Sequence, residues 1–249
     1  MVLVEVMQSW KKDRILYQMT EEERKNLYIS FLDKYLTTAE LIDYTNELFN
    51  SKFWQNLQEM RKEKYKKYGR DLGMYSATLQ ILFSLIRKYK PKLLVETGVH
   101  FGLSTAVFLY AMKLNQQGKL ISIDNWDSEE CGCYVTKDIS TRWELKIGKS
   151  MDILPNLNWE LIDFFCHDSA HTYKNMWDEY RWAIGRVKQG GLIISHDVGS
   201  SNAWFEFVKK YNLEWYLVKT AIKKAYATGI TFGIKKEVDN GIQKLDSFL

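Results

Sequence analysis

The chain has 249 residues, which is enough for one full hydrophobic core and an appendage. Hydrophobic residues make up 46% of it and charged residues 27%, as in ordinary globular proteins, and the net charge of +4 is too small to indicate a nucleic-acid partner. The sequence shows no apolar run near the ~20 residues of a membrane span and no secretory signal, and its three cysteines cannot all pair within one chain. We therefore expect a cytoplasmic protein with reduced thiols and without a membrane partner.

The first 90 residues predict helices. Thr20 and Thr37 each precede a glutamate by three residues, which is the spacing of a capping box. A third helix is predicted from about 52 to 68, with Gly69 as its C-terminal cap, and a fourth from about 74 to 89. The third helix is rich in lysine and arginine, but acidic residues are interspersed, which favours a solvated surface over a polyanion-binding face.

Residues 92–105 read KLLVETGVHFGLST and predict a strand, a glycine turn and a helix. The apolar run before Glu96 fits a buried parallel strand, and helical spacing begins at Leu103. Gly98 and Gly102 would let the backbone approach a ligand at the start of the helix, where N–H groups are unpaired. The glycine spacing is neither that of a dinucleotide fold nor that of a phosphate loop.

Two further strands are predicted at 119–124 and 143–147. The first ends on Asp124, whose carboxylate could accept hydrogen bonds from both hydroxyls of a ribose, or could merely cap a loop. The second leads into a short turn that carries Gly148 and Ser150.

A fourth strand, 161–168, ends in an acid and is followed by a turn with His171 and a helix from about 173 to 187. A Gly-Gly pair ends that helix before a fifth strand at 192–195. Strands that alternate with helices predict an α/β fold with a doubly wound, mostly parallel sheet. Because parallel strands end at one edge, their polar end residues should meet there: Glu96, Asp124, Asp168, His171, His196 and Asp197.

Two motifs carry a resemblance to a known family. E-T-G-V-H-F-G-L-S-T resembles motif I of the class I S-adenosylmethionine-dependent methyltransferases. D-x-x-H-x-Y, a long helix and then Gly-Gly-hydrophobic-x-x-His-Asp resembles a narrower group, the macrocin-type O-methyltransferases and their cephalosporin-hydroxylase-type relatives. The resemblance covers about residues 91–235 and implies a seven-stranded sheet, with an antiparallel hairpin formed by 213–219 and 226–235.

The resemblance also implies a cofactor site for S-adenosyl-L-methionine. In the family the acid of motif I helps bind the amino group of the cofactor, and the acid after the second strand binds its ribose. Carried onto this chain, the cofactor-binding residues are Glu96, Thr97, Gly98, Gly102, Ser104, Asp124, Asn125, Gly148, Ser150 and Asp168.

A divalent metal is implied as well, with Asp168, His196 and Asp197 as its ligands. Relatives often have an acid where this chain has His196, and an imidazole shifts the preference from Mg²⁺ toward Mn²⁺, Zn²⁺ or Fe²⁺. His196 could equally act as a base, or it could contact the metal ligands without binding the metal itself. Asp168 and His171 are the predicted catalytic residues, His171 as general base because histidines change charge near neutral pH, or else only as a hydrogen-bonding turn residue.

We interpret the chain as a helical region at 1–74, a methyltransferase-like domain at 75–236 and a polar tail at 237–249. The expected reaction is O-methylation of a small-molecule hydroxyl with help from a divalent metal (Mg, Mn or Fe). The helical region would roof the acceptor pocket or form a homodimer interface. The alternatives are a metal-dependent hydroxylase-like enzyme on the same scaffold and a non-catalytic cofactor-binding protein. A nucleic-acid amino methylase is not expected, since its Asn/Asp-Pro-Pro-Tyr/Phe signature does not follow the fourth strand.

Overall fold

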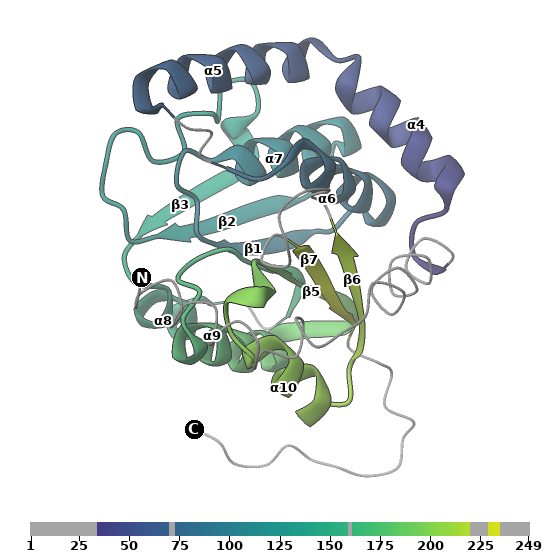
Figure 1. Ribbon diagram of the computed structural model, residues 1–249, viewed down its shortest axis with the longest axis vertical. Helices are drawn as coiled ribbons and strands as arrows, with labels where there is room; N and C mark the ends of the chain where they lie inside the picture. The colour runs from purple at the N-terminus through teal and green to yellow at the C-terminus, as the bar shows by residue number, and fades with distance from the viewer. Residues whose placement is uncertain (1–33, 70–72, 159–160, 220–228, 235–249) are drawn as a thin grey trace, which may run out of the picture.

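The computed structural model describes residues 34–69, 73–158, 161–219 and 229–234, and these form a sheet covered by helices on both faces (Figure 1). The sheet has seven strands in the order β3-β2-β1-β4-β5-β7-β6. β1 to β5 are parallel, and β7 runs antiparallel to both β5 and β6. This confirms the predicted seven-stranded, mostly parallel α/β fold. The strands are β1 (Leu93–Thr97), β2 (Lys119–Asp124), β3 (Trp143–Ile147), β4 (Ile162–His167), β5 (Val187–His196), β6 (Glu214–Lys219) and β7 (Gly229–Ile234).

Each face of the sheet has its own hydrophobic core, because successive side chains of a strand point to opposite faces. Leu94 of β1 packs with the helices of one face, whereas Leu93 and Val95 pack with those of the other. The first group of helices is α4 (Thr38–Phe49), α5 (Lys52–Tyr68), α6 (Ser76–Tyr89) and α7 (Leu103–Asn115). The second group is α8 (Ser150–Ile153), α9 (Tyr173–Arg186) and α10 (Ala203–Lys210).

The local signals of the N-terminal helices are confirmed where the structure describes them. The Thr37 hydroxyl accepts from the backbone N–H of Glu40, and the Glu40 carboxylate accepts from the backbone N–H of Thr37, which together make a capping box. Gly69 ends α5 in the left-handed conformation. The expected capping box at Thr20 and the polar tail at 237–249 lie outside the described residues.

One boundary differs from the prediction. The Gly190–Gly191 pair was expected to end the helix, but α9 already ends at Arg186, and the two glycines belong to β5. The reason is close packing, since a Cβ on Gly191 would lie 2.5 Å from the carbonyl oxygen of Asp163. Glycine at this position therefore allows β5 to pack closely against β4, in a region where the register between the two strands is irregular.

The carboxyl ends of β1 to β5 lie at one edge of the sheet, which we call the rim. The chain proceeds from β1 to one side through β2 and β3 and to the other through β4 and β5, so the strand order reverses between β1 and β4. Ligands of open α/β sheets bind at such a reversal. Within the described residues, no helix combines the length and the apolar character that crossing a bilayer requires.

Candidate functional site

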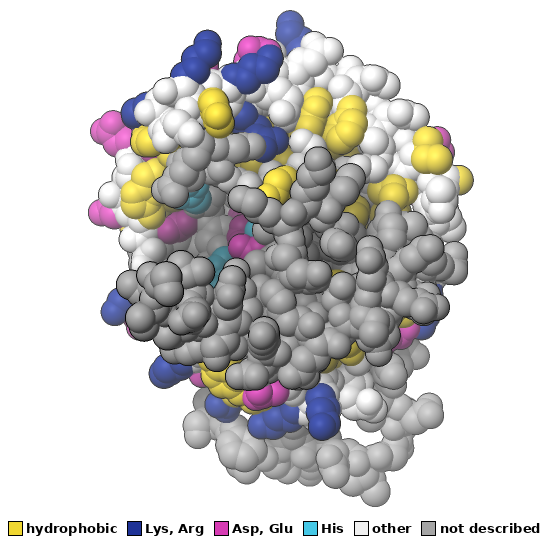
Figure 2. All heavy atoms as spheres, viewed as in Figure 1, with side chains coloured by type: hydrophobic (Ala, Val, Ile, Leu, Met, Phe, Trp, Pro, Cys, Tyr) yellow, Lys and Arg dark blue, Asp and Glu magenta, His cyan; other side chains and the backbone are white. Residues whose placement is uncertain are grey.

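A cavity of about 790 Å³ opens at the rim, over the ends of β1, β2 and β4 and the starts of α8 and α9. Figure 2 shows acidic and histidine side chains inside a hollow on this face of the molecule. A cavity of this size is in the range that holds a small molecule or cofactor. Six of the predicted cofactor residues line it: Gly98, Asp124, Asn125, Gly148, Ser150 and Asp168.

Gly98 brings the two central loops of the rim into direct contact. Its φ of 86° is in the left-handed region, and a Cβ at this position would collide with the backbone carbonyl of Asp168. The backbone N–H of Asp168 also donates to the carbonyl of Thr97, at 2.8 Å. The glycine is therefore required by the fold itself, in addition to any approach of a ligand.

Asp124 holds the glycine loop in place. Its Oδ2 accepts from the backbone N–H groups of Val99 and His100, at 2.6 and 2.8 Å, and its Oδ1 accepts from that of Trp126 at 2.8 Å. His100 has a φ of 51°, a strained value that these bonds help to maintain. A carboxylate has about four acceptor positions, and these bonds use three, so one remains for a ligand hydroxyl.

Four predicted cofactor residues do not reach the cavity wall: Glu96, Thr97, Gly102 and Ser104. The Glu96 carboxylate is fully buried and accepts from the hydroxyls of Ser104, Thr105 and Ser122, at 2.5 to 2.8 Å. Burial raises the pKa of Glu96 to about 7, although the three hydroxyls act in the opposite direction. Glu96 lies within a strand covered on both faces, so its side chain points into the core beneath α7. Direct contact of these four residues with a cofactor stays a prediction.

Below the cavity, Glu179 of α9 was not singled out from the sequence. Its buried carboxylate accepts five hydrogen bonds, which come from the side chains of Thr97, Ser150, His167, Ser169 and Asn175. Burial opposes ionisation, but these partners, His167 foremost, lower the pKa of Glu179 to about 2. A signal did exist, because Glu179 falls on the buried stripe of α9 that Met176, Tyr180 and Ala183 define.

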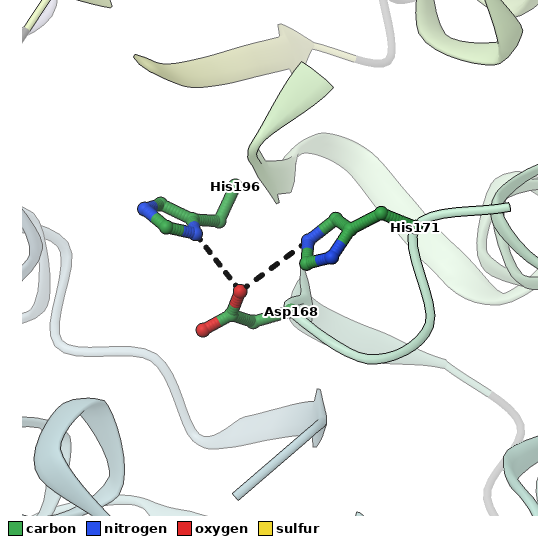
Figure 3. Close-up of side chains that lie close together, drawn as sticks. All are labelled: Asp168, His171 and His196. Carbon is green, nitrogen blue, oxygen red and sulfur yellow. Dashed lines mark hydrogen bonds and ion pairs between the residues drawn. The ribbon is translucent and has the colours of Figure 1, made fainter. Parts of the chain in front are cut away.

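Asp168, at the end of β4, lies between two histidines (Figure 3). Its Oδ1 is 2.9 Å from Nδ1 of His196 and 3.5 Å from Nε2 of His171. Burial opposes ionisation of Asp168, but the two imidazoles hold its pKa well below the ordinary value. Burial alone would lower the pKa of His196, yet the charge of Asp168 raises it to about 9. The acid and the two histidines therefore form one coupled group at the edge of the cavity.

This group has the donor atoms of a metal site. Within the described residues, Asp168, His171 and His196 each offer a ligand atom, and these atoms lie within 4.8 Å of one another. Nε2 of His171, Nε2 of His196 and Oδ1 of Asp197 are buried without a hydrogen-bond partner, as expected where a bound group completes the site. Of the predicted ligands, the structure brings Asp168 and His196 together. Asp197 does not join this group, although its Oδ1 lies 3.6 Å from Nδ1 of His196.

Comparison with known proteins agrees with this geometry. Residues 95–198 match a family model described as a methyltransferase domain. No curated protein matches the sequence.

Several solved structures share the fold. The O-methyltransferase TomG from Streptomyces achromogenes, solved with S-adenosylmethionine, is 16% identical, with a TM-score of 0.60 over 88% of this chain and 100% of that one. An O-methyltransferase from Bacillus cereus, solved with S-adenosylhomocysteine, is 15% identical, with a TM-score of 0.58 over 86% and 99%. A methyltransferase from Geobacter sulfurreducens is 15% identical, with a TM-score of 0.58 over 73% and 89%.

The fold and the matched domain agree with the resemblance of the glycine loop to motif I of the methyltransferases. The family model spans β1 to the end of β5, which includes every strand end that borders the cavity. The chain therefore shares its fold with solved methyltransferases, and its residues 95–198 are similar to a methyltransferase domain.

Proposed function

We propose that the protein transfers a methyl group from S-adenosylmethionine to a hydroxyl oxygen of a small molecule, with a divalent cation bound at the rim. The observation that carries the proposal is the position of Asp168, which lines the cofactor-sized cavity and also contacts both imidazoles. The names of the O-methyltransferases that share the fold support oxygen as the acceptor atom.

The reaction needs the acceptor aligned behind the methyl group and relieved of its proton. His171 would take the hydroxyl proton on Nε2, which lies 3.5 Å from the carboxylate of Asp168. The acceptor oxygen then forms a bond to the methyl carbon as the carbon–sulfur bond breaks, and that electron pair stays on sulfur, which gives S-adenosylhomocysteine. Asp168, beside His171, stabilises the imidazolium that results.

Asp168 and His196 would hold the cation, with Asp197 as a third ligand. A divalent ion at this place would lower the pKa of the acceptor hydroxyl and orient it. One nitrogen donor with two carboxylates favours Mn²⁺, Fe²⁺ or Zn²⁺ over Mg²⁺.

The function is tested with the full chain in two steps. Calorimetric titration with S-adenosylhomocysteine measures cofactor binding, and methyl transfer from radiolabelled S-adenosylmethionine is then measured across a panel of phenols, catechols and sugar hydroxyls. We expect turnover with at least one class, and a loss of at least ~100-fold in His171→Ala, because general-base catalysis contributes about that much. Cofactor binding without turnover or metal uptake would instead identify a non-catalytic binding protein.

The preference for metal ions gives a second test. We expect the metal-free protein to bind Mn²⁺ at least ~10-fold more tightly than Mg²⁺, because imidazole suits the softer ion. His196→Asp should reduce this difference by restoring an all-oxygen site. Electron paramagnetic resonance of Mn²⁺, with Mg²⁺ as competitor, measures both. Equal affinities in the unmodified protein would contradict the proposed ligand role of His196.

One observation favours a second candidate. Two imidazoles and one carboxylate within reach of each other are also the donor set of iron oxygenases. A hydroxylase-like enzyme on this scaffold would consume oxygen with Fe²⁺ and show turnover without the methyl donor. Methyl transfer that continues under anaerobic conditions would favour the methyltransferase over the hydroxylase-like enzyme.

A further inference from the structure

Glu179 brings a buried negative charge close to the cavity. The residue is fully buried, and its Oε1 accepts from the side chains of Ser150, Ser169 and Asn175 at 2.5 to 3.0 Å. These three residues line the cavity, whereas Glu179 does not. A single layer of side chains therefore separates the carboxylate from a ligand that fills the cavity.

The hydrogen bonds of Glu179 favour the ionised carboxylate. Its Oε2 also accepts from the hydroxyl of Thr97 at 2.5 Å and from Nδ1 of His167 at 2.7 Å. An ionised carboxylate only accepts, so it matches a set of partners that can all donate. Burial opposes ionisation, yet these partners, His167 foremost, lower the pKa of Glu179 to about 2. The side chain is therefore negatively charged at neutral pH.

Within the described residues, no positive side chain offsets this charge. Glu179 has an ion-pair contact there only with His167, and no lysine or arginine pairs with it. His167 is itself fully buried, and its Nε2 has no hydrogen-bond partner in the part of the chain that the structure describes. A protonated imidazole would bury an N–H group without an acceptor, so the neutral form that donates from Nδ1 fits this site. The pair therefore retains a net negative charge.

The other charges of the cavity are paired or screened more strongly than that of Glu179. Three charged side chains of the lining are exposed to solvent: Lys149, Asp152 and Lys174. Asp178 pairs with Lys174 at 2.5 Å, and Asp168 pairs with an imidazole at 2.9 Å. Asp124 is half-buried and borders the cavity directly. Since water and mobile ions weaken exposed charges more than buried ones, the charge of Glu179 acts on a ligand with the least screening.

We propose that Glu179 makes the cavity selective for a positively charged ligand, so that it binds the sulfonium of S-adenosylmethionine in preference to the neutral thioether of S-adenosylhomocysteine. The inference rests on the proposed function and adds a role for a residue that takes no part in the transfer step. A buried charge without a counter-charge costs free energy, and a cationic ligand in the cavity offsets that cost.

The charge of the ligand changes during the reaction. When the bond between sulfur and the methyl carbon breaks, its electron pair stays on sulfur and the positive charge of the sulfur is lost. Glu179 therefore favours the methyl donor before transfer and no longer favours the product after it. Because the sulfur is most positive before transfer, the carboxylate acts on donor binding and product exchange and does not accelerate the transfer itself.

The selectivity is measured by titration calorimetry of the full chain with S-adenosylmethionine and with S-adenosylhomocysteine, in the absence of an acceptor. One unit charge at ~10 Å from another changes an affinity by about tenfold when the effective dielectric constant is about 20. Water in an open cavity reduces this effect, so we expect Glu179→Gln to weaken binding of the sulfonium at least ~3-fold more than binding of the thioether. A purely structural role would weaken both alike.

Two further variants separate charge from structure. Glu179→Asp keeps the charge on a shorter side chain, so it should retain the ratio of the two affinities even if both fall. Glu144→Gln is the matched control, because Glu144 pairs with Lys119 and Lys146 outside the cavity, and it should change neither affinity. Circular dichroism checks the fold of each variant. A folded Glu179→Gln with the same ratio as the unmodified protein would overturn the proposal.

The unmodified protein decides the matter if Glu179→Gln does not fold. It should bind S-adenosylmethionine at least ~3-fold more tightly than S-adenosylhomocysteine, and equal or reversed affinities would overturn the proposal. Failure of the proposed function gives a different result. If the unmodified protein binds neither ligand, the cofactor assignment itself fails, whereas equal binding of both removes only the selection by Glu179.

Discussion

An acidic side chain near the rim can either line the cavity or lie buried in the core, and Asp124 and Glu96 are examples of the two. Both are acids at the end of a strand, and both were predicted to touch the cofactor. Asp124 lines the cavity and holds the glycine loop, whereas Glu96 is buried among three hydroxyls. The difference follows from strand geometry, because Glu96 precedes the last residue of β1 and Asp124 is the last residue of β2.

The raised pKa of Glu96 predicts how stability depends on pH. Burial raises the pKa of Glu96 to about 7 in the folded protein, whereas a free glutamate side chain has a pKa of 4.5. Between these values the folded state binds more protons than the unfolded state, so this group makes stability fall as pH rises, by up to ~3 kcal/mol. Glu96→Gln lacks this titration. Urea unfolding at pH 5 and pH 8 should therefore show a smaller loss for the variant, and equal losses would contradict the assignment.

Asp124 gives a prediction for binding. Asp124→Ala leaves the backbone N–H groups of Val99, His100 and Trp126 without their acceptor, so the glycine loop loses its support. We expect the affinity for S-adenosylhomocysteine to fall at least ~10-fold, which corresponds to ~1.4 kcal/mol. Asp138→Ala is the control, because Asp138 pairs with Lys113 at the surface. Calorimetry measures both, and an unchanged affinity in Asp124→Ala would remove this residue from the site.

Among the elements, the loops after β1 and β4 depend on each other through Gly98. Gly98→Ala forces the Asp168 backbone to move and places alanine at a positive φ. We expect a loss of more than ~1 kcal/mol in stability and weaker binding of S-adenosylhomocysteine.

Gly185→Ala provides the matched comparison for this substitution. Gly185 lies in α9, and a Cβ there would meet nothing within 4 Å. Alanine should therefore stabilise the helix by ~0.5–1 kcal/mol. Thermal unfolding distinguishes the two variants, and the same response from both would contradict the packing argument.

The sequence predicted those elements whose signals are local. The capping box at Thr37, the end of α5 at Gly69 and the strands 119–124 and 143–147 depend on residues close together in the chain, and the structure has them. The convergence of Asp168, His171 and His196 also followed, because parallel strands end at one edge.

Contacts between distant elements could not be predicted in this way. Whether Glu96 points to the cavity or into the core depends on what covers β1. The five bonds of Glu179 join segments up to 82 residues apart, and no periodicity shows which donors will meet it. The buried stripe of α9 marks the position of Glu179, but only the folded chain shows its partners.

Across the whole molecule, the N-terminal helices share a core with the sheet. Leu48 of α4 and Leu57 of α5 are buried in the same cluster as Leu82 of α6 and Leu94 of β1. Arg87 of α6 also pairs with Glu47 of α4 through two hydrogen bonds, at 2.7 and 2.9 Å. The predicted boundary between the helical region, 1–74, and the methyltransferase-like domain, 75–236, therefore stays a proposal about function. We expect the two parts to unfold together.

Two truncations on α4 test this expectation. Leu48 is fully buried, so Leu48→Ala should cost ~2–5 kcal/mol and lower the melting temperature of the whole chain in one transition. Ile42 lies on the same helix and is 55% exposed, and Ile42→Ala should have little effect. Calorimetric melting that separates into two transitions in Leu48→Ala would show that the helices unfold independently.

The contact between Gly98 and the Asp168 backbone has a consequence for how this protein could be re-engineered. With no side chain between them, the loop that would cradle the nucleoside and the loop that would handle the proton and the cation behave as a single rigid part. A redesign that widens one of them for a bulkier cofactor analogue will shift the other and lower turnover. Substitutions that alter acceptor choice without that penalty are better sought away from this junction, on the surfaces that face the two loops.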